Sequence, residues 1–202
     1  IRTGKIEISN ARKFKSNTSD DVSIGFIGAG SFAQGSLLPN IPKTNGVKLK
    51  GVMTTTSTTS KSAAERFGFE FCTCKAEDIL DNQDINTVFI ATRHDSHSQY
   101  VLKSLKAGKH VFVEKPLCLT NEELEEINNY YEQANNQQQL LVGYNRRFAP
   151  LTAILKTKLG REPMAMIYRI NAGAIPSDSW IQDMQIGGGR ILGEVCHFVD
   201  YL

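Results

Sequence analysis

The chain lacks the sequence features of several large protein classes. It has no apolar run close to the ~20 residues that a membrane-spanning helix needs. Its four cysteines form no Cys-x-x-Cys pair and no His/Cys cluster with zinc-finger spacing, which speaks against a structural metal site. A net charge of +2 over 202 residues is too small to indicate a nucleic-acid or membrane partner. We therefore expect a cytoplasmic protein with reduced thiols and no metal.

What the sequence does contain is an alternating pattern from residue 22 onward. Short apolar runs that read as buried strands are separated by segments with helical periodicity or capping signals. The expected strands are residues 22–28, 47–53, 69–71, 85–91, 109–114 and 139–144. Continuous apolar strands alternating with helices predict an α/β fold with a doubly wound parallel sheet of Rossmann type. In such a sheet, ligands bind beyond the carboxyl ends of the strands.

The first of these strands leads into a glycine motif. Residues 28–33, Gly-Ala-Gly-Ser-Phe-Ala, match G-x-G-x-x-A between a strand and an expected helix. Gly28 would make the tight turn, Gly30 would let a pyrophosphate approach the backbone, and Ala33 would let helix and strand pack closely. Ser31 and Phe32 open the helix, whose N-terminus attracts anions. This context predicts dinucleotide binding, with an adenosylmethionine-dependent methyltransferase as an alternative.

The second strand ends without the acidic residue that usually binds the adenosine ribose. Seven consecutive hydroxyl residues, 54–60, begin at that strand end. A carboxylate there normally accepts the ribose 2′-hydroxyl and repels a 2′-phosphate. Thr54 and Thr55 carry no charge, so the sequence predicts NADP or NAD as cofactor. A solvated Ser/Thr loop without a binding role is the alternative interpretation.

Two further residues suit proton chemistry. Lys115 follows Glu114 at the end of the expected strand 109–114 and is held by Pro116. An ammonium at that edge can stabilise negative charge developing on a substrate oxygen. His197 lies in an expected helix with Glu194 three residues before it and Asp200 three residues after it, so that all three could share one face. A histidine near carboxylates can exchange protons near neutral pH. We also predict that the Lys115–Pro116 peptide is cis.

Several motifs together resemble the glucose-fructose oxidoreductase/inositol dehydrogenase (Gfo/Idh/MocA) family. They are "GFIGAGSFA", "AGKHVFVEKPL", "VGYNRRFAP" and "GGGRILGEVCHFVDYL". Members of this family join an N-terminal Rossmann domain to a C-terminal α/β domain built on an open sheet, and they oxidise or reduce sugars and polyols with NAD or NADP. The resemblance implies a carbohydrate-like small-molecule substrate and, for the full-length protein, a homo-oligomer.

The resemblance also implies roles for individual residues. Lys115 would be the catalytic lysine and would also contact the cofactor near its nicotinamide, while Glu114 would contact the cofactor ribose. His197 would bind the substrate and act as the acid/base that exchanges a proton with its hydroxyl. The residues that would lie along the cofactor after the strand 85–91 are Thr92, His94 and His97. Arg147 and Trp180 would line the substrate side of the junction between the two domains.

Three departures from the family pattern change these expectations. The family's usual Thr-Pro-Asn is here Thr92-Arg93-His94, and its usual aspartate four residues before the catalytic histidine is Gly193. Glu194, one residue on, is the candidate replacement for that carboxylate. The third departure is Thr54, which stands where the family commonly has an acid.

The expected domain organisation has three parts. Residues 1–21 are polar and basic and read as a linker or tail. The variants "GAGSFAQGSLLPNI" and "GEVCHF" also resemble the C-terminal half of bacterial fusion proteins that join an alcohol dehydrogenase-like domain to this family. That resemblance implies that residues 1–21 connect the two domains. Residues 22–147 form the NAD(P)-binding Rossmann domain. Residues 148–202 begin an incomplete C-terminal substrate and oligomerisation domain, with a helix at 150–159 and a long strand at 163–175. The expected function is NAD(P)-dependent oxidation of a secondary alcohol or reduction of its ketone; the alternative is a non-catalytic dinucleotide-binding module or sensor.

Overall fold

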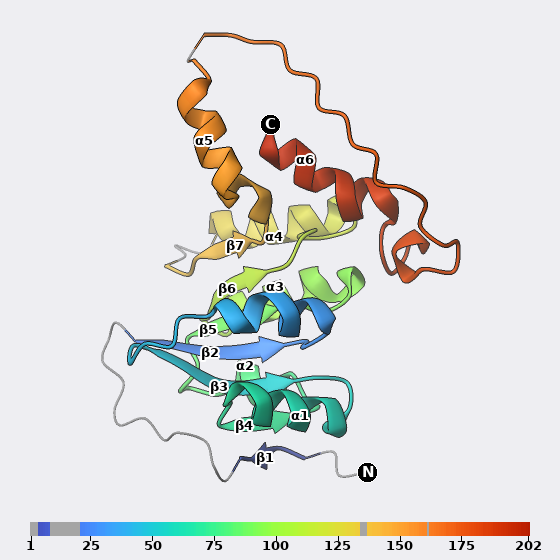
Figure 1. Cartoon of the computed structure of the whole chain (residues 1–202). Helices are drawn as coiled ribbons and strands as arrows, with labels where there is room; N and C mark the ends of the chain where they lie inside the picture. The colour runs from blue at the N-terminus through green and yellow to red at the C-terminus, as the bar shows by residue number, and fades with distance from the viewer. Residues whose placement is uncertain (1–3, 9–20, 134–136, 161) are drawn as a thin grey trace.

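The computed structural model describes residues 4–8, 21–133, 137–160 and 162–202. Its centre is a seven-stranded sheet with the order β1-β4-β3-β2-β5-β6-β7 (Figure 1). The strands are β1 (Ile6–Glu7), β2 (Val22–Ile27), β3 (Val47–Met53), β4 (Phe71–Thr73), β5 (Thr87–Ile90), β6 (His110–Val113) and β7 (Leu140–Val142). Every pairing is parallel except that of β1 with β4. The predicted α/β fold with a doubly wound sheet is confirmed.

The strand order places a switch point beside the glycine motif. From β2 the chain builds β3 and β4 on one side, and it then returns to build β5, β6 and β7 on the other. The ladder continues at the strand ends, where Gly28 N donates to Met53 O and Ala91 N donates to Ile27 O, each over 2.9 Å. The carboxyl ends of β3, β2 and β5 therefore lie level, and the ligand crevice of this fold class opens between β2 and β5.

Helices cover both faces of the sheet, as parallel strands require. The described helices of four or more residues in the α conformation are α1 (Ser57–Phe67), α2 (Glu77–Leu80), α3 (His97–Lys106), α4 (Asn121–Gln133), α5 (Pro150–Lys158) and α6 (Cys196–Tyr201). One core cluster lies between the sheet and α2, α3 and α4, and includes the buried Ile79, Val101 and Ile127. The other lies beneath α1 and the helix after the glycine motif. Side chains alternate between the two clusters along β2, with Phe26 in one and Ile27 in the other.

An aromatic row crosses the sheet on the face beneath α1. Phe26 on β2 stacks on Phe89 of β5 with ring centroids 5.0 Å apart, and Phe89 stacks on Phe112 of β6 at 4.8 Å. Phe26 also meets the edge of Phe69 at 5.9 Å. These contacts tie the two halves of the sheet together across the switch point, because β2 and β5 belong to different halves.

Two sequence-based expectations need correction near the beginning of the chain. Within the segment read as a linker, Ile6 and Glu7 pair with β4 as an edge strand, while residues 9–20 lie outside the described residues. The helix after the glycine motif is irregular, with a π-helical turn at Ala33–Leu37 and a 3-10 turn at Leu38–Asn40. Pro39 is accommodated in the first turn of the 3-10 segment, and the helix ends at Asn40 because Ile41, the residue before Pro42, is extended.

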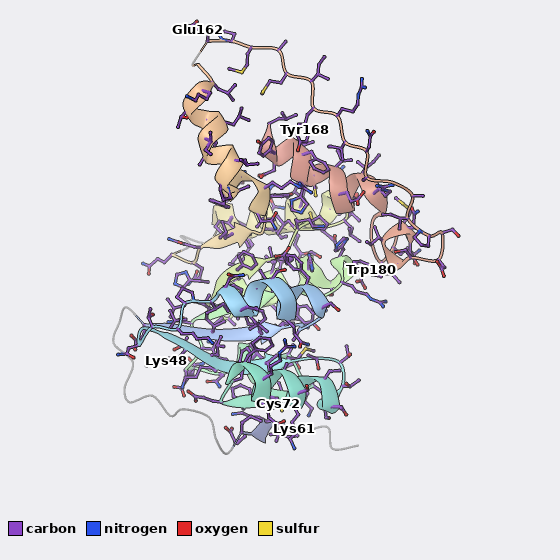
Figure 2. All side chains as sticks on the ribbon, in the orientation of Figure 1. Lys48, Lys61, Cys72, Glu162, Tyr168 and Trp180 are labelled. Atoms are coloured by element: carbon purple, nitrogen blue, oxygen red, sulfur yellow. The ribbon has the colours of Figure 1, made fainter. Side chains whose placement is uncertain are left out.

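The long strand expected at residues 163–175 is wrong. These residues have no regular secondary structure. Figure 2 shows them as an extended stretch of chain that follows Glu162 and includes Tyr168. Ile167 is 94% exposed, and no strand among the described residues pairs with this segment. A β-strand is stabilised by hydrogen bonds to a neighbouring strand, so an alternating pattern without a partner does not form one.

Candidate functional site

The glycine motif forms the turn at the carboxyl end of β2. Gly28 has φ of 91°, and a Cβ atom there would lie 2.5 Å from the carbonyl oxygen of Ala91. Only glycine fits this approach between the ends of β2 and β5. At Gly30, by contrast, a Cβ atom would have nothing within 4 Å, so the backbone borders open space where a ligand can approach.

The helix that follows begins at the motif with an anion-binding end. Gln34 N donates to Gly30 O over 3.0 Å, which closes the first helical turn. The N–H groups of a first turn have no intrahelical acceptor and attract negative charge. Ser31 and Phe32 are exposed there, while Ala33 is buried in the core. These positions fit the pyrophosphate of a dinucleotide.

The hydroxyl-rich stretch is largely the capped start of α1 rather than a loop. Thr56 is the N-cap, and its side chain accepts a hydrogen bond from the backbone N–H of Thr59. Thr54 is buried, and its hydroxyl bonds to Thr59 Oγ1 over 2.5 Å and donates to Thr56 O over 2.9 Å. Thr55 is exposed at the end of β3. Thr54 thus organises the turn, and Thr55 is the residue that faces solvent there.

The loop after β5 carries Thr92, His94 and His97. The Thr92 hydroxyl accepts a hydrogen bond from Ser96 Oγ over 2.7 Å. His97 is fully buried, with Nδ1 2.7 Å from Pro116 O and Nε2 3.2 Å from Thr92 O. The direct cofactor contact expected of His97 does not fit this burial. His97 instead connects the loop after β5 to the Lys115–Pro116 turn.

His94 faces the C-terminal part of the chain. Its Nδ1 lies 2.8 Å from the carbonyl oxygen of Gly187, and its ring meets the edge of Trp180 with centroids 4.8 Å apart. Burial lowers the pKa of His94 to about 4, so the ring is neutral at neutral pH. The neutral tautomer that satisfies the Gly187 carbonyl carries its proton on Nδ1.

The Glu114-Lys115-Pro116 segment follows β6, and its Lys115–Pro116 peptide is cis, as predicted. The Glu114 side chain is nearly buried, and burial raises the pKa of its carboxyl to about 7, although the charge of Lys115 opposes this rise. The Lys115 ammonium donates to the carbonyl oxygen of Gly193 over 2.6 Å. The structure therefore brings the end of β6 against a segment 78 residues later in the chain.

His197 lies in α6 close to Lys115. Burial lowers the pKa of His197, and the positive charges of Lys115 and Arg146 lower it further. Its Nδ1 atom is buried and has no hydrogen-bond partner among the described residues. The ring of Tyr144, which follows β7, meets His197 edge-on at 6.1 Å. The charge of Lys115 thus acts on the His197 imidazole, and the Lys115 ammonium is bound to the backbone of Gly193, four residues before it.

The remaining predicted residues lie around this pair. Glu194 bonds to Arg190 over 2.7 Å, so the structure does not support it as the carboxylate partner of His197. The carboxylate that raises the pKa of His197 is Asp200. Arg147 binds Asp200, with Arg147 Nε donating to Asp200 Oδ2 over 3.0 Å. Trp180 lies at the side of the molecule beside the loop after β5 (Figure 2).

Sequence reasoning missed the contribution of the glycine backbone. The carbonyl groups of Gly187 and Gly193 bind His94 and Lys115, respectively. A side-chain motif gives no signal for a carbonyl acceptor. The only signal in the sequence is the run of three glycines at 187–189, which permits a tight turn with φ near 70° at Gly188 and Gly189.

Comparison with known proteins agrees with this geometry. Residues 22–144 match the model of an oxidoreductase family with an NAD-binding Rossmann fold, the family of glucose-fructose oxidoreductase and inositol dehydrogenase. The chain belongs to this family. The resemblance predicted from the motifs is therefore confirmed, and with it the nicotinamide dinucleotide as the cofactor class of the Rossmann domain.

Several relatives act on sugars. Levoglucosan dehydrogenase of Pseudarthrobacter phenanthrenivorans is 32% identical over 147 residues, which cover 68% of this chain and 37% of that protein. The 1,5-anhydro-D-fructose reductase of Ensifer adhaerens is 27% identical over 188 residues, covering 88% of this chain and 54% of that protein. A levoglucosan dehydrogenase structure with NADH and levoglucosan matches with a TM-score of 0.73 at 25% identity, covering 90% of this chain and 53% of that one. The chain thus spans about two fifths to one half of the length of these relatives.

The described residues contain neither a metal-binding cluster nor a membrane-spanning helix. No group of three or more His, Cys, Asp or Glu side chains in the described part of the chain is arranged to hold a metal ion. Within the same residues, no helix is long and apolar enough to cross a membrane.

Proposed function

We propose that the protein is an NAD(P)-dependent oxidoreductase that oxidises a secondary alcohol of a sugar or polyol, or reduces the corresponding ketone. The observation that carries this proposal is that the Lys115 ammonium, after the end of β6, binds the Gly193 carbonyl four residues before His197, while its charge lowers the pKa of that imidazole. A cation and a neutral imidazole next to a dinucleotide site are suited to moving a proton while a hydride is transferred. The sugar-related relatives support this substrate class.

Each residue of the pair has a distinct role in the proposed reaction. The low pKa of His197 keeps its imidazole neutral at neutral pH, so it can accept the proton of a substrate hydroxyl. Lys115 would hydrogen-bond the same oxygen and stabilise the negative charge that develops on it. A bound nicotinamide would supply the hydride acceptor or donor. In the reductive direction the protonated His197 would return the proton to the carbonyl oxygen.

The cofactor would lie along the carboxyl ends of β2, β3 and β5. The open space at Gly30 and the helix end at Ser31 would hold the pyrophosphate, and Thr55 would border the adenosine ribose. No carboxylate stands among residues 54–60 to repel a 2′-phosphate. The amino end of α1 adds a favourable potential for that phosphate, which supports use of NADP as well as NAD.

One observation favours a second candidate, a non-catalytic dinucleotide-binding module. The Lys115 ammonium is bound to a backbone carbonyl, and Glu194 pairs with Arg190 rather than with His197. Catalysis requires that Lys115 exchange the Gly193 carbonyl for a substrate oxygen or bind both.

The expected domain boundaries, the homo-oligomeric assembly and the cytoplasmic location stay predictions.

The two candidates are separated by measuring cofactor binding and turnover on the same protein. NADH and NADPH binding is followed by cofactor fluorescence. Turnover is followed by nicotinamide absorbance with levoglucosan and myo-inositol as alcohols and 1,5-anhydro-D-fructose as the carbonyl substrate. For an active substrate, we expect Lys115→Ala and His197→Asn each to lower kcat/KM by about 100-fold or more, since positioned acid/base groups contribute that much. Cofactor affinity should change only a few-fold.

The matched control is Lys61→Ala, because Lys61 is an exposed lysine on α1 that pairs with Glu65. It should leave turnover unchanged. Full turnover by Lys115→Ala would refute the proposed mechanism. Tight cofactor binding without turnover on a broad panel of sugars and polyols would favour the non-catalytic module.

A further inference from the structure

One cluster of contacts joins the Rossmann sheet to the C-terminal segment through His94. His94 is 7% exposed and lies in the 3-10 turn His94–Ser96 after β5. Its Nδ1 bonds to Gly187 O over 2.8 Å, and the next residue's N–H, that of Asp95, donates to Ile186 O over 3.1 Å. Two adjacent hydrogen bonds therefore fix the backbone at 186–187 to this turn.

The same imidazole lies against Gly193. A Cβ atom on Gly193 would be 3.3 Å from His94 Cε1 and 3.6 Å from Gly187 O. The ring and the Gly187 carbonyl therefore lie on the side of Gly193 where a side chain would begin. The Gly193 carbonyl is in turn the acceptor for the Lys115 ammonium at 2.6 Å. His94 and Lys115 thus bind the same short segment, His94 at Gly187 and Lys115 at Gly193.

We propose that His94 is a positioning residue for Lys115: through the Gly187 carbonyl it holds the 187–193 segment in place, so that the Gly193 carbonyl orients the Lys115 ammonium. This inference rests on the proposed function only in giving Lys115 a catalytic role. The contact itself is a property of the folded chain. Loss of the His94 hydrogen bond should release the segment and leave the ammonium less constrained.

The direction of the hydrogen bond defines informative substitutions. Gly187 O can only accept, so His94 must donate from Nδ1. In His94→Asn the side-chain amide nitrogen can occupy nearly the position of Nδ1 and donate the same bond, whereas His94→Phe keeps an aromatic ring against Trp180 but has no donor. His94→Ala removes both. The three variants therefore separate hydrogen bonding from packing.

The reactivity of the Lys115 amine reports its constraint without any substrate. The purified protein is treated with limiting acetic anhydride at fixed pH, and acetylation at each lysine is quantified by peptide mass spectrometry. Lys61 serves as the internal standard, because it is exposed on α1 and remote from the cluster. We expect His94→Phe and His94→Ala to raise the ratio of Lys115 to Lys61 labelling by roughly threefold to tenfold, the factor for losing a hydrogen bond of about 1 kcal/mol. His94→Asn should stay within about twofold of the wild type.

Two measurements guard against a trivial loss of folding. Circular dichroism with urea titration shows whether each variant is folded, and the emission of Trp180, the one tryptophan of the chain, reports its environment next to residue 94. If His94→Phe or His94→Ala does not fold, Gly193→Ala tests the same contact from the other side, because its Cβ would press on His94 Cε1. It should also raise Lys115 labelling.

The proposal is overturned if folded His94→Phe and His94→Ala label Lys115 at the wild-type ratio, or if His94→Asn labels as fast as His94→Ala. Failure of the proposed function has a different signature. In that case Lys115→Ala keeps turnover, or no turnover is found, while the labelling ratios still follow the His94 substitutions.

Discussion

Replacing Glu114 by glutamine tests whether the sheet edge holds a carboxyl group that is costly to ionise. Glu114 is 9% exposed at the end of β6, and a Cβ atom on the neighbouring Gly143 would lie 3.0 Å from its Oε1. This packing leaves little room for water around the carboxyl. Burial is the main cause that raises its pKa from an ordinary value of 4.5 to about 7, and the charge of Lys115 only partly offsets it.

The size and sign of the effect follow from linkage. At about 1.4 kcal/mol for each pH unit, the difference between 4.5 and about 7 corresponds to roughly 3 kcal/mol. Between these two pH values the native state holds a proton that the unfolded chain has released, so the free energy of unfolding falls as the pH rises. The full penalty is present above pH 7 and absent below pH 4.5. Glutamine keeps the shape of the neutral acid and cannot ionise, so the variant avoids the penalty.

The assay is urea denaturation of the wild type and Glu114→Gln at several pH values from 4.5 to 8, without cofactor. We expect similar free energies of unfolding at pH 4.5 and a variant that is more stable by about 2–3 kcal/mol at pH 8. Glu125→Gln on the exposed side of α4 is the matched control and should show no such divergence. A constant difference between wild type and Glu114→Gln across this range would refute the reasoning, because it would mean that Glu114 ionises equally in both states.

Two further predictions concern the hydroxyl-rich stretch. Thr56→Ala removes the N-cap of α1 and should lower the free energy of unfolding by about 1 kcal/mol in urea titration. The control Thr58→Ala, at an exposed position in the same turn, should change it by less than about 0.5 kcal/mol. Equal effects of the two substitutions would argue against the cap. Thr55→Asp places a carboxylate at the exposed end of β3 and should weaken NADPH binding about 10-fold relative to NADH in fluorescence titration, a coupling of about 1.4 kcal/mol. The neutral Thr55→Asn should preserve the wild-type ratio, and an unchanged ratio in Thr55→Asp would place the 2′-phosphate elsewhere.

The parallel sheet could be predicted because its signals are local. Each strand from β2 to β7 overlaps an expected strand, although β4 (Phe71–Thr73) begins only where the expected strand 69–71 ends. The signals that end the helices between them are equally local. Gly68 ends α1 in the left-handed conformation. Thr120 and Glu123 cap the start of α4 with reciprocal hydrogen bonds: Glu123 N donates to Thr120 Oγ1, and Thr120 N donates to Glu123 Oε2, each over 3.2 Å. Such signals act within one helical turn, so a single sequence contains them in full.

The errors in the predicted fold arise where strand formation depends on a distant pairing partner rather than on the local sequence. Residues 163–175 have the composition of a strand, but a strand is completed only by a neighbour, which the described residues do not offer. Ile6 and Glu7 have no strand signal of their own, and they form β1 because β4 presents a free edge to which Ile6 and Glu7 can bond. In both cases the decisive partner lies far away in the sequence, and periodicity within a short window cannot detect it.

The same distinction explains the candidate site. Gly28, Lys115 and the peptide before Pro116 could be singled out because they lie at strand ends, where ligands bind in this fold class. A spacing of three residues on a helix favours Glu194 as a partner of His197. Arg190, four residues before Glu194, nevertheless binds this carboxylate. Spacing on a helix identifies the possible partners of a side chain and does not choose among them.

The segment 187–193 contributes to the candidate site through its backbone. His94 and Lys115 both bind carbonyl groups in the segment 187–193, so neither interaction depends on which side chains that segment carries. It depends on the absence of side chains, because a Cβ atom at Gly187 would lie 2.5 Å from the backbone of Ile181, and one at Gly193 would press on His94. Glycine at these positions is therefore as much a determinant of the Lys115 environment as a carboxylate would be. The environment of Lys115 is therefore best probed by adding a methyl group at one of these glycines rather than by removing a charged side chain.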